Sequence, residues 1–215
     1  MHKYNASMKT LNIPLISADD LDTALETKGA SFKVDQIGWP EAFPYAPFCA
    51  GRIAHTDKAL VVDFRVSGLD LRVQNLQDNG RSWEDSTCEI FIQVPGREDY
   101  YNFEVNAGGY LLAANGPGRE GRTKLPEEVL AKVGRIRSLD IHEPVDNKGG
   151  IWNWRVGLII PFEIIGLSEA PATLRANMYK CGDLTAHPHY LSWAPVGTPK
   201  PDFHRPEFFG ELILA

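Results

Sequence analysis

Short segments of the chain alternate apolar with polar or aromatic residues, and this alternation constrains the fold more than any other sequence feature. In segment 87–93 (TCEIFIQ), one face carries Cys88, Ile90 and Ile92. In segment 59–67 (ALVVDFRVS), one face carries Leu60, Val62, Phe64 and Val66. A period of two residues is the pattern of a β-strand with two differently used faces. Both segments are therefore predicted to be strands with one face in a core.

Strand patterns recur along the chain, and helical patterns are few. The further predicted strands are 11–16, 100–106, 110–114, 135–142, 152–160, 173–180 and 210–214. Segment 126–133 (PEEVLAKV) predicts a helix, with proline first and acids early, and Ser17, Asp19 and Asp20 could cap another short one. Because strands and helices do not alternate, we expect an all-β fold, an antiparallel sandwich of jelly-roll type with one short helix and long irregular loops.

The length of 215 residues fits one domain, in which residues 1–30 form an N-terminal extension packing on the sandwich. The net charge of −6 and the lack of a dense Lys/Arg cluster argue against nucleic acid or an anionic membrane as partner. The basic run 119–124 is interrupted by other residues, so it is interpreted as a solvated loop. No apolar stretch reads as a secretory leader or a membrane span, so export is expected only if a leader preceded this sequence.

Cysteines and histidines predict neither a disulfide framework nor a zinc site. Cys49, Cys88 and Cys181 have no CxxC spacing, and Cys88 lies inside a strand pattern that favours a buried thiol. His187, His189 and His204 lie in proline-interrupted segments, where structural hydrogen bonding is the favoured interpretation. No phosphate-binding or dinucleotide motif is present, so no organic cofactor is expected.

Trp83 is the strongest candidate for a binding residue. Its neighbours in the chain are polar, namely Arg81, Ser82, Glu84 and Asp85. A pyranose ring has apolar faces that stack on aromatic side chains and a rim of hydroxyls that needs acids or amides. Trp193, in the proline-rich tail 191–209, could supply the other face. Glu89 and Asn106, at strand positions, could bind the hydroxyls.

Two other functions remain open. Glu84, Asp85 and Glu89 could be the carboxylates of a glycoside hydrolase or of an accessory domain of one. The third hypothesis is that the protein keeps the sandwich fold, has lost its sugar ligand and serves as an interaction domain. A shared, solvent-open cleft between Trp83 and Trp193 would distinguish sugar binding from both.

Four segments resemble the family 9 carbohydrate-binding modules, in particular the stand-alone proteins of that type from Bacteroidetes. They are 83–91 (WEDSTCEIF), 102–106 (NFEVN), 175–183 (RANMYKCGD) and the tail 192–210. The resemblance implies a β-sandwich that binds gluco- or xylo-configured mono- or oligosaccharides at chain ends between two tryptophans. It also implies structural calcium and a role in polysaccharide use, with a glycoside hydrolase as possible partner.

The positions of these residues in the family's motifs imply their roles. Trp83 and Trp193 are expected to hold the sugar between them, Glu89 to accept a hydrogen bond from a sugar hydroxyl, and Asn106 to contact the sugar through its amide. Glu104 stands where binding members often have an arginine. Tyr190, close to Trp193, completes the expected ligand-binding set, and no catalytic residue is expected.

Overall fold

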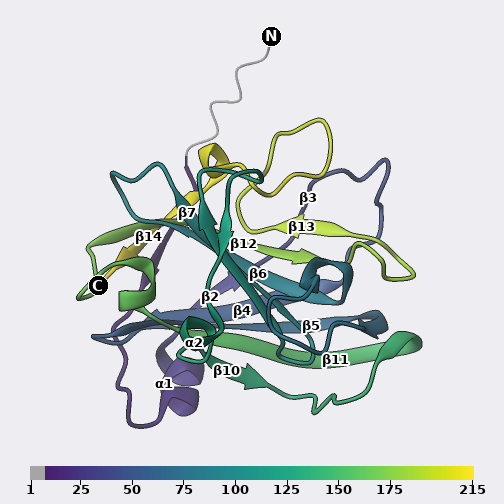
Figure 1. The fold of residues 1–215 in the computed structure, drawn as a ribbon, viewed down its shortest axis with the longest axis horizontal. Coiled ribbons are helices and arrows are strands. Elements are labelled where there is room, and N and C mark those ends of the chain that lie inside the picture. The colour runs from purple at the N-terminus through teal and green to yellow at the C-terminus, as the bar shows by residue number, and fades with distance from the viewer. Residues whose placement is uncertain (1–7) are drawn as a thin grey trace.

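The computed structural model describes residues 8–215 as two β-sheets that pack face to face (Figure 1). The larger sheet has the order β1 (Thr10–Ile13), β14 (Gly210–Leu214), β12 (Thr173–Cys181), β6 (Thr87–Gln93), β7 (Tyr100–Asn106), β8 (Leu111–Gly116) and β9 (Thr123–Lys124). It also contains β13 (Tyr190–Ser192), paired with β12, and β3 (Gln36–Ile37), paired with β13. The smaller sheet has the order β10 (Gly134–Arg137), β11 (Val145–Pro161), β5 (Ala59–Val73), β4 (Phe48–His55) and β2 (Ala30–Lys33).

The fold is therefore the all-β sandwich that the alternation predicts. Strand β1 runs parallel to β14, and the other pairs between these strands are antiparallel. The helices are the α-helices α1 (Leu21–Lys28) and α2 (Glu127–Leu130) and the 3-10 helices η1 (Ser82–Glu84), η2 (Phe162–Ile165) and η3 (Pro206–Phe208). No helix among residues 8–215 is long and apolar enough to cross a membrane.

The main core lies between the two sheets. The apolar faces predicted for the segments 59–67 and 87–93 are buried there. Their buried side chains are Leu60, Val62, Phe64, Val66, Cys88, Ile90 and Ile92. Burying one such aliphatic or aromatic side chain stabilises the fold by about 1.5–3 kcal/mol. The alternation thus identified the residues that hold the sheets together.

A second apolar cluster covers the outer face of the larger sheet. Phe91, on the face of β6 away from the main core, is buried in it, together with Tyr179 of β12. The proline-rich tail supplies the cover, and the ring of Phe203 stacks on Tyr179 with centroids 4.1 Å apart. In Figure 1 this tail, drawn in yellow, runs along the larger sheet on the side away from the smaller sheet. Both faces of β6 are buried as a result, as its seven buried residues show.

Residues 8–30 contribute regular structure to the sandwich. Strand β1 forms an edge of the larger sheet, and α1 lies outside the smaller sheet (Figure 1). Asp20 caps α1 by accepting a hydrogen bond from the Thr23 N–H at 3.2 Å. Leu25 anchors the helix by packing on Ala54 and Val61.

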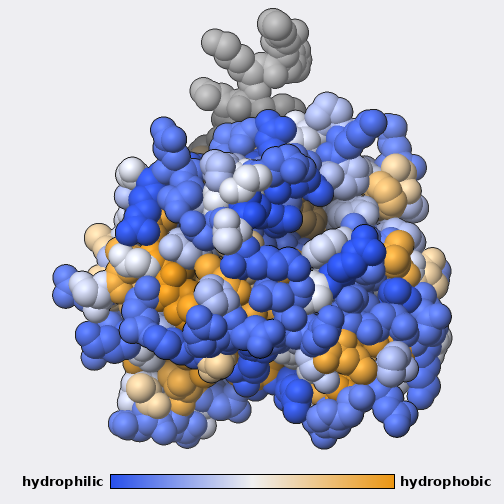
Figure 2. Space-filling view, in the orientation of Figure 1, coloured by the Kyte–Doolittle hydropathy of each residue, from blue (hydrophilic) through white to orange (hydrophobic). Residues whose placement is uncertain are grey.

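Several expectations about the strands were wrong. The strand expected at 11–16 ends at Ile13, and the one expected at 152–160 begins at Val145. The strands β2, β3, β4, β9 and β13 were not predicted. Strand β5 continues to Val73 because β11 pairs with it over Val145–Pro161, so the polar stretch after Gly68 is partly strand. The strand expected at 135–142 ends at Arg137, where the pairing of β10 with β11 stops. The face shown in Figure 2 is mostly hydrophilic, with apolar side chains in separate patches.

Candidate binding site

A pocket of about 210 Å³ lies on the outer face of the larger sheet, under the tail. Its lining residues are Trp83, Glu89, Glu104, Arg119, Arg122, Cys181, Asp183, Tyr190, Pro201, Asp202, Phe203 and His204. Pockets for drug-sized ligands span about 300–1,000 Å³. A smaller cavity suits one small unit, such as a single ring, better than a long chain.

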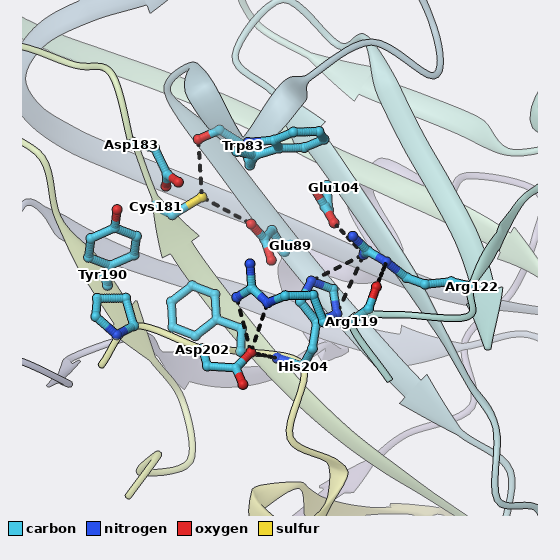
Figure 3. A pocket seen from close by; sticks show the side chains of 12 residues that line it. Trp83, Glu89, Glu104, Arg119, Arg122, Cys181, Asp183, Tyr190, Asp202 and His204 are labelled. Atoms are coloured by element: carbon cyan, nitrogen blue, oxygen red, sulfur yellow. Dashed lines mark hydrogen bonds and ion pairs between the residues drawn. The ribbon is translucent and has the colours of Figure 1, made fainter. Parts of the chain in front are cut away.

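Trp83 forms one wall of the pocket (Figure 3). Helix η1 holds it through two backbone hydrogen bonds, from Glu84 N–H to Arg81 C=O and from Asp85 N–H to Ser82 C=O, each 3.0 Å long. The backbone carbonyl of Trp83 accepts a hydrogen bond from the Asp183 N–H at 3.1 Å. The wall is therefore tied to the segment that follows β12, and its position does not depend on a free loop.

Glu89 and Glu104 lie at the floor of the pocket, on neighbouring strands. They are direct partners in the antiparallel pairing of β6 and β7, and they are 3% and 2% exposed. The thiol of Cys181 donates to Glu89 Oε1 at 3.0 Å. The amide of Asn102 donates to Glu104 Oε1 at 2.9 Å. Glu104 Oε2 is buried and has no hydrogen-bond partner in the described part of the chain.

Burial raises the pKa of three carboxyls in the pocket. Desolvation, followed by the charge of Glu104, raises the pKa of Glu89 well above its ordinary value. Desolvation raises the pKa of Glu104 to about 7, although the Arg122 guanidinium opposes the shift. Desolvation also raises the pKa of Asp183 to about 6, against the hydrogen-bonding effect of Tyr190. The three acids thus crowd one poorly solvated space.

The opposite wall comes from the tail and from the segment between β8 and β9 (Figure 3). Arg119 contacts Asp202 at 3.0 Å, and Arg122 lies 3.5 Å from Glu104 Oε1. Arg122 Nη1 also lies 3.1 Å from Nε2 of His204. Burial and the two guanidinium groups lower the pKa of His204 to about 2, so its imidazole is neutral.

The basic run 119–124 is largely exposed, as its composition suggested, but two of its residues also line the pocket. Arg119 and Arg122 line the pocket because the tail brings Asp202 and His204 to them. These pairs join residues more than eighty positions apart, so nothing in the local sequence indicates them.

Trp193 does not line the pocket, and the expectation that it forms the second wall was wrong. Its side chain is 2% exposed and belongs to the main core between the sheets. The pairing of β13 with β12 explains this. Tyr190 is the partner of Cys181, whose side chain faces the pocket, and Trp193 comes three residues later, on the opposite side. Its ring packs so closely on Gly210 that an added Cβ would lie 2.4 Å away.

Asn106 also has a structural role in place of the expected ligand contact. Its amide nitrogen donates to the Asn75 C=O at 2.9 Å and to Asp85 Oδ2 at 3.0 Å. Its amide oxygen accepts from the N–H groups of Gly108 and Tyr110, each at 3.1 Å. Asn106 therefore closes the β7–β8 hairpin and does not line the pocket.

The acids considered for hydrolysis are not brought together. Asp85 is fully buried and accepts from the N–H groups of Gln74 at 2.9 Å and Asn75 at 3.0 Å. Glu84 pairs with Arg81 at 3.0 Å and does not line the pocket. Of these three acids, only Glu89 lies in the pocket.

Tyr190 lies in the pocket wall, as a member of the expected set, and so do several residues that sequence reasoning did not single out. The missed residues are Arg119, Arg122, Cys181, Asp183, Pro201, Asp202, Phe203 and His204. The sequence could have indicated Cys181, because the strand alternation of 173–181 puts its side chain on the same face as Tyr179. Asp183 follows two residues later. The tail was the right segment, but residues 201–204 and not Trp193 face the pocket.

The described residues contain no group of three or more His, Cys, Asp or Glu arranged to hold a metal ion. The histidines considered as metal ligands make separate contacts. His187 pairs with Asp70 at 2.5 Å, His189 lies 2.8 Å from Lys180 Nζ, and His204 lies 2.8 Å from the Tyr100 hydroxyl. Structural calcium, which the resemblance implies, stays a prediction, because Ca²⁺ is also bound by backbone and amide oxygens.

Comparison with known proteins points to one family. The family model described as "Carbohydrate-binding family 9" matches residues 19–214. No curated protein matches the chain. A putative carbohydrate-binding protein from Bacteroides uniformis is 33% identical, with a TM-score of 0.92 over 97% of this chain and 100% of that one.

Two further solved structures share the fold at low identity. Both are of a carbohydrate-binding module family 9 from Caldicellulosiruptor kristjanssonii. The structure in complex with glucose is 15% identical, with a TM-score of 0.55 and coverage of 96% of each chain. The structure in complex with cellotriose is 14% identical, with a TM-score of 0.55 over 96% of this chain and 93% of that one.

Proposed function

The chain belongs to carbohydrate-binding family 9, and on that premise we propose that it is a non-catalytic protein whose pocket under Trp83 binds a sugar. The observation that carries the proposal is the pairing of one aromatic wall with buried carboxyls in a single small cavity. This combination matches a ring with an apolar face and a polar rim.

The pocket residues divide the recognition between them. The ring of Trp83 stacks on one face of the sugar, and Glu89, Glu104 and Asp183 accept hydrogen bonds from its hydroxyls. Tyr190 closes the side of the site. A gluco- or xylo-configured unit at the end of a chain fits a cavity of about 210 Å³. Glucose and cellotriose, bound by a structural relative, support this choice of configuration.

A single tryptophan wall replaces the two-tryptophan clamp in this proposal. An aromatic contact contributes about 0.5–1.5 kcal/mol beyond area burial, so one wall predicts a modest affinity for a monosaccharide. The polar floor then carries more of the binding free energy than in a symmetric clamp. A glycoside hydrolase is the partner we propose for such a module, because sugar binding without turnover would serve to hold an enzyme near its substrate.

Isothermal titration calorimetry tests the binding proposal. We expect heat with glucose, xylose or their short oligomers, and a loss of about tenfold or more in affinity for Trp83→Ala. Trp152→Ala is the matched control, since Trp152 lies outside the pocket and contacts Lys148. Heat from none of these sugars, or an unchanged affinity in Trp83→Ala, would refute the proposal.

The absence of turnover is tested separately. We propose binding without hydrolysis because Glu84 and Asp85 lie outside the pocket, where they cannot pair with Glu89 around a bound sugar. Incubation with a glycan panel should release no reducing sugar. Release that disappears in Glu89→Gln while binding persists would instead favour the glycoside hydrolase.

A further inference from the structure

Resting on the proposed function, we propose that the pocket prefers a sugar with a free, positively charged amino group, such as a 2-amino-2-deoxyhexose. The geometry behind this proposal is a cluster of buried carboxyls that lacks sufficient positive charge and contains one oxygen without any hydrogen-bond partner. A charged amine on the ligand would supply both the charge and the missing donor.

The charges that line the pocket do not balance. Its carboxyls are those of Glu89, Glu104, Asp183 and Asp202, and its cations are Arg119 and Arg122. Arg119 forms an ion pair with Asp202, with hydrogen bonds of 3.0 and 3.3 Å. Arg122 is shared, because it donates to the Arg119 C=O at 3.1 Å and lies 3.1 Å from His204 as well as 3.5 Å from Glu104. Among residues 8–215, no ion pair involves Glu89 or Asp183.

Hydrogen bonding within the pocket is also incomplete. Glu104 Oε2 is fully buried and has no partner among the described residues, although the side chain lines the pocket. Glu89 accepts from the Cys181 thiol, which is a weak donor. Glu104 Oε2 has almost no accessible surface, so a ligand that donates several hydrogen bonds at one point satisfies it once the carboxyl group turns toward the pocket.

The register of β6 and β7 places those oxygens within reach of one group. Glu89 and Glu104 are direct cross-strand partners, and such residues have their Cβ atoms about 4.5–5.5 Å apart. An ammonium group has three donors and a compact charge, so it can bridge two carboxylates at this spacing. A hydroxyl has one donor and no charge, so it does not stabilise the state in which both carboxyls are ionised.

Burial is the main cause of the raised pKa values of Glu89, Glu104 and Asp183, and neighbouring carboxylates raise them further. A bound ammonium group stabilises the ionised carboxylates, so it should lower these pKa values and release protons. The titratable and charged groups around the cluster are Glu84, Tyr100, Arg119, Arg122, Tyr179, Lys180, Cys181, Tyr190, Asp202 and His204. We expect affinity for the amino sugar to rise from about pH 5 to about pH 7, as the carboxyls ionise.

Calorimetry with three matched ligands tests the preference. Glucose, glucosamine and N-acetylglucosamine differ at one position, and only glucosamine carries the charge. We expect glucosamine to bind about tenfold or more tightly than either neutral sugar, with an advantage that shrinks at high salt. Glu104→Gln should remove most of this advantage, and Glu127→Gln, an exposed acid outside the pocket, should keep it. Thermal melts of both variants verify that they are folded.

Proton release is a second readout that a structural role of Glu104 would not produce. Titrations with glucosamine in two buffers of different ionisation enthalpy should show net proton release near pH 7, and those with glucose should show little. If glucosamine binds no more tightly than glucose while Trp83→Ala still abolishes glucose binding, the amino preference is wrong and the proposed function stands. If no sugar binds, or if binding does not depend on Trp83, the proposed function itself fails.

Discussion

Glu89 and Glu104 face each other across neighbouring strands, both nearly inaccessible to solvent, at the floor of the pocket. Like charges directly opposite each other on a sheet are destabilising, and their burial adds a desolvation cost. Arg122 compensates in part, and the raised pKa of both carboxyls means that protonation relieves the remaining repulsion. An arrangement that reduces stability at a pocket is typical of a binding site, because there the sequence serves the ligand as well as the fold.

Removing the charge of Glu104 should stabilise the protein at high pH. Its folded pKa of about 7 lies above the ordinary value of 4.5, so protonation favours the fold. Its contribution to stability is fully present below about pH 4.5 and is lost as pH rises through about 7. Glu104→Gln should therefore raise the free energy of unfolding by about 1–3 kcal/mol at pH 8 and by much less at pH 5. Urea unfolding at both pH values measures this, and an equal effect at both would contradict it.

Trp193 and Trp83 should respond in opposite ways to truncation. Trp193→Ala leaves a large cavity in the main core and should lower the free energy of unfolding by about 3–5 kcal/mol. Trp83 is only half-buried, so Trp83→Ala should cost about 1 kcal/mol or less while sugar binding is lost. Denaturant unfolding together with calorimetry separates the two. If the Trp193→Ala protein were as stable as the unmodified protein but no longer bound sugar, Trp193 would belong to the binding site after all.

Asn106→Ala should destabilise the β7–β8 hairpin and leave the intrinsic sugar affinity unchanged. The substitution leaves Asp85 and the N–H groups of Gly108 and Tyr110 each short of a partner. Unsatisfied buried groups cost about 1–3 kcal/mol each, so a total of about 2–4 kcal/mol is expected after partial relaxation. Titration at a temperature where the variant is folded checks the affinity, and a selective loss of binding would show that Asn106 contacts the ligand.

The thiols of this protein should be unreactive in the folded state. Cys49, Cys88 and Cys181 are buried, and burial raises the pKa of Cys88 and Cys181 well above the ordinary thiol value. Since the thiolate is the reactive form, a thiol reagent at about pH 8 should label the native protein slowly and the urea-unfolded protein fully. Rapid labelling of native Cys181 would indicate that the floor of the pocket is more open than the structure shows. Labelling sites are identified by mass spectrometry.

Local patterns were sufficient for most of the longer strands and for the core faces of β5 and β6, but they missed β2, β3, β4, β9 and β13. The alternation in 59–67 and 87–93 predicts which side chains enter the core, because the side chains of a strand alternate with period two whatever it pairs with. The same argument failed for Phe91, which lies on the opposite face and is nevertheless buried. Its cover is the tail, and no local pattern indicates where a proline-rich segment without regular structure will lie.

What the sequence by itself determined is most of the longer strands, the core faces of β5 and β6, and a family resemblance that predicts Trp83 and Glu89 in one site. Only the tertiary structure decided the second wall, since the pairing of β13 with β12 turns Trp193 into the core and leaves Tyr190 at the pocket. A shift of one residue in that pairing would exchange the two faces. The physical reason is that side-chain alternation is local, whereas register and tail placement depend on contacts between residues far apart in the chain.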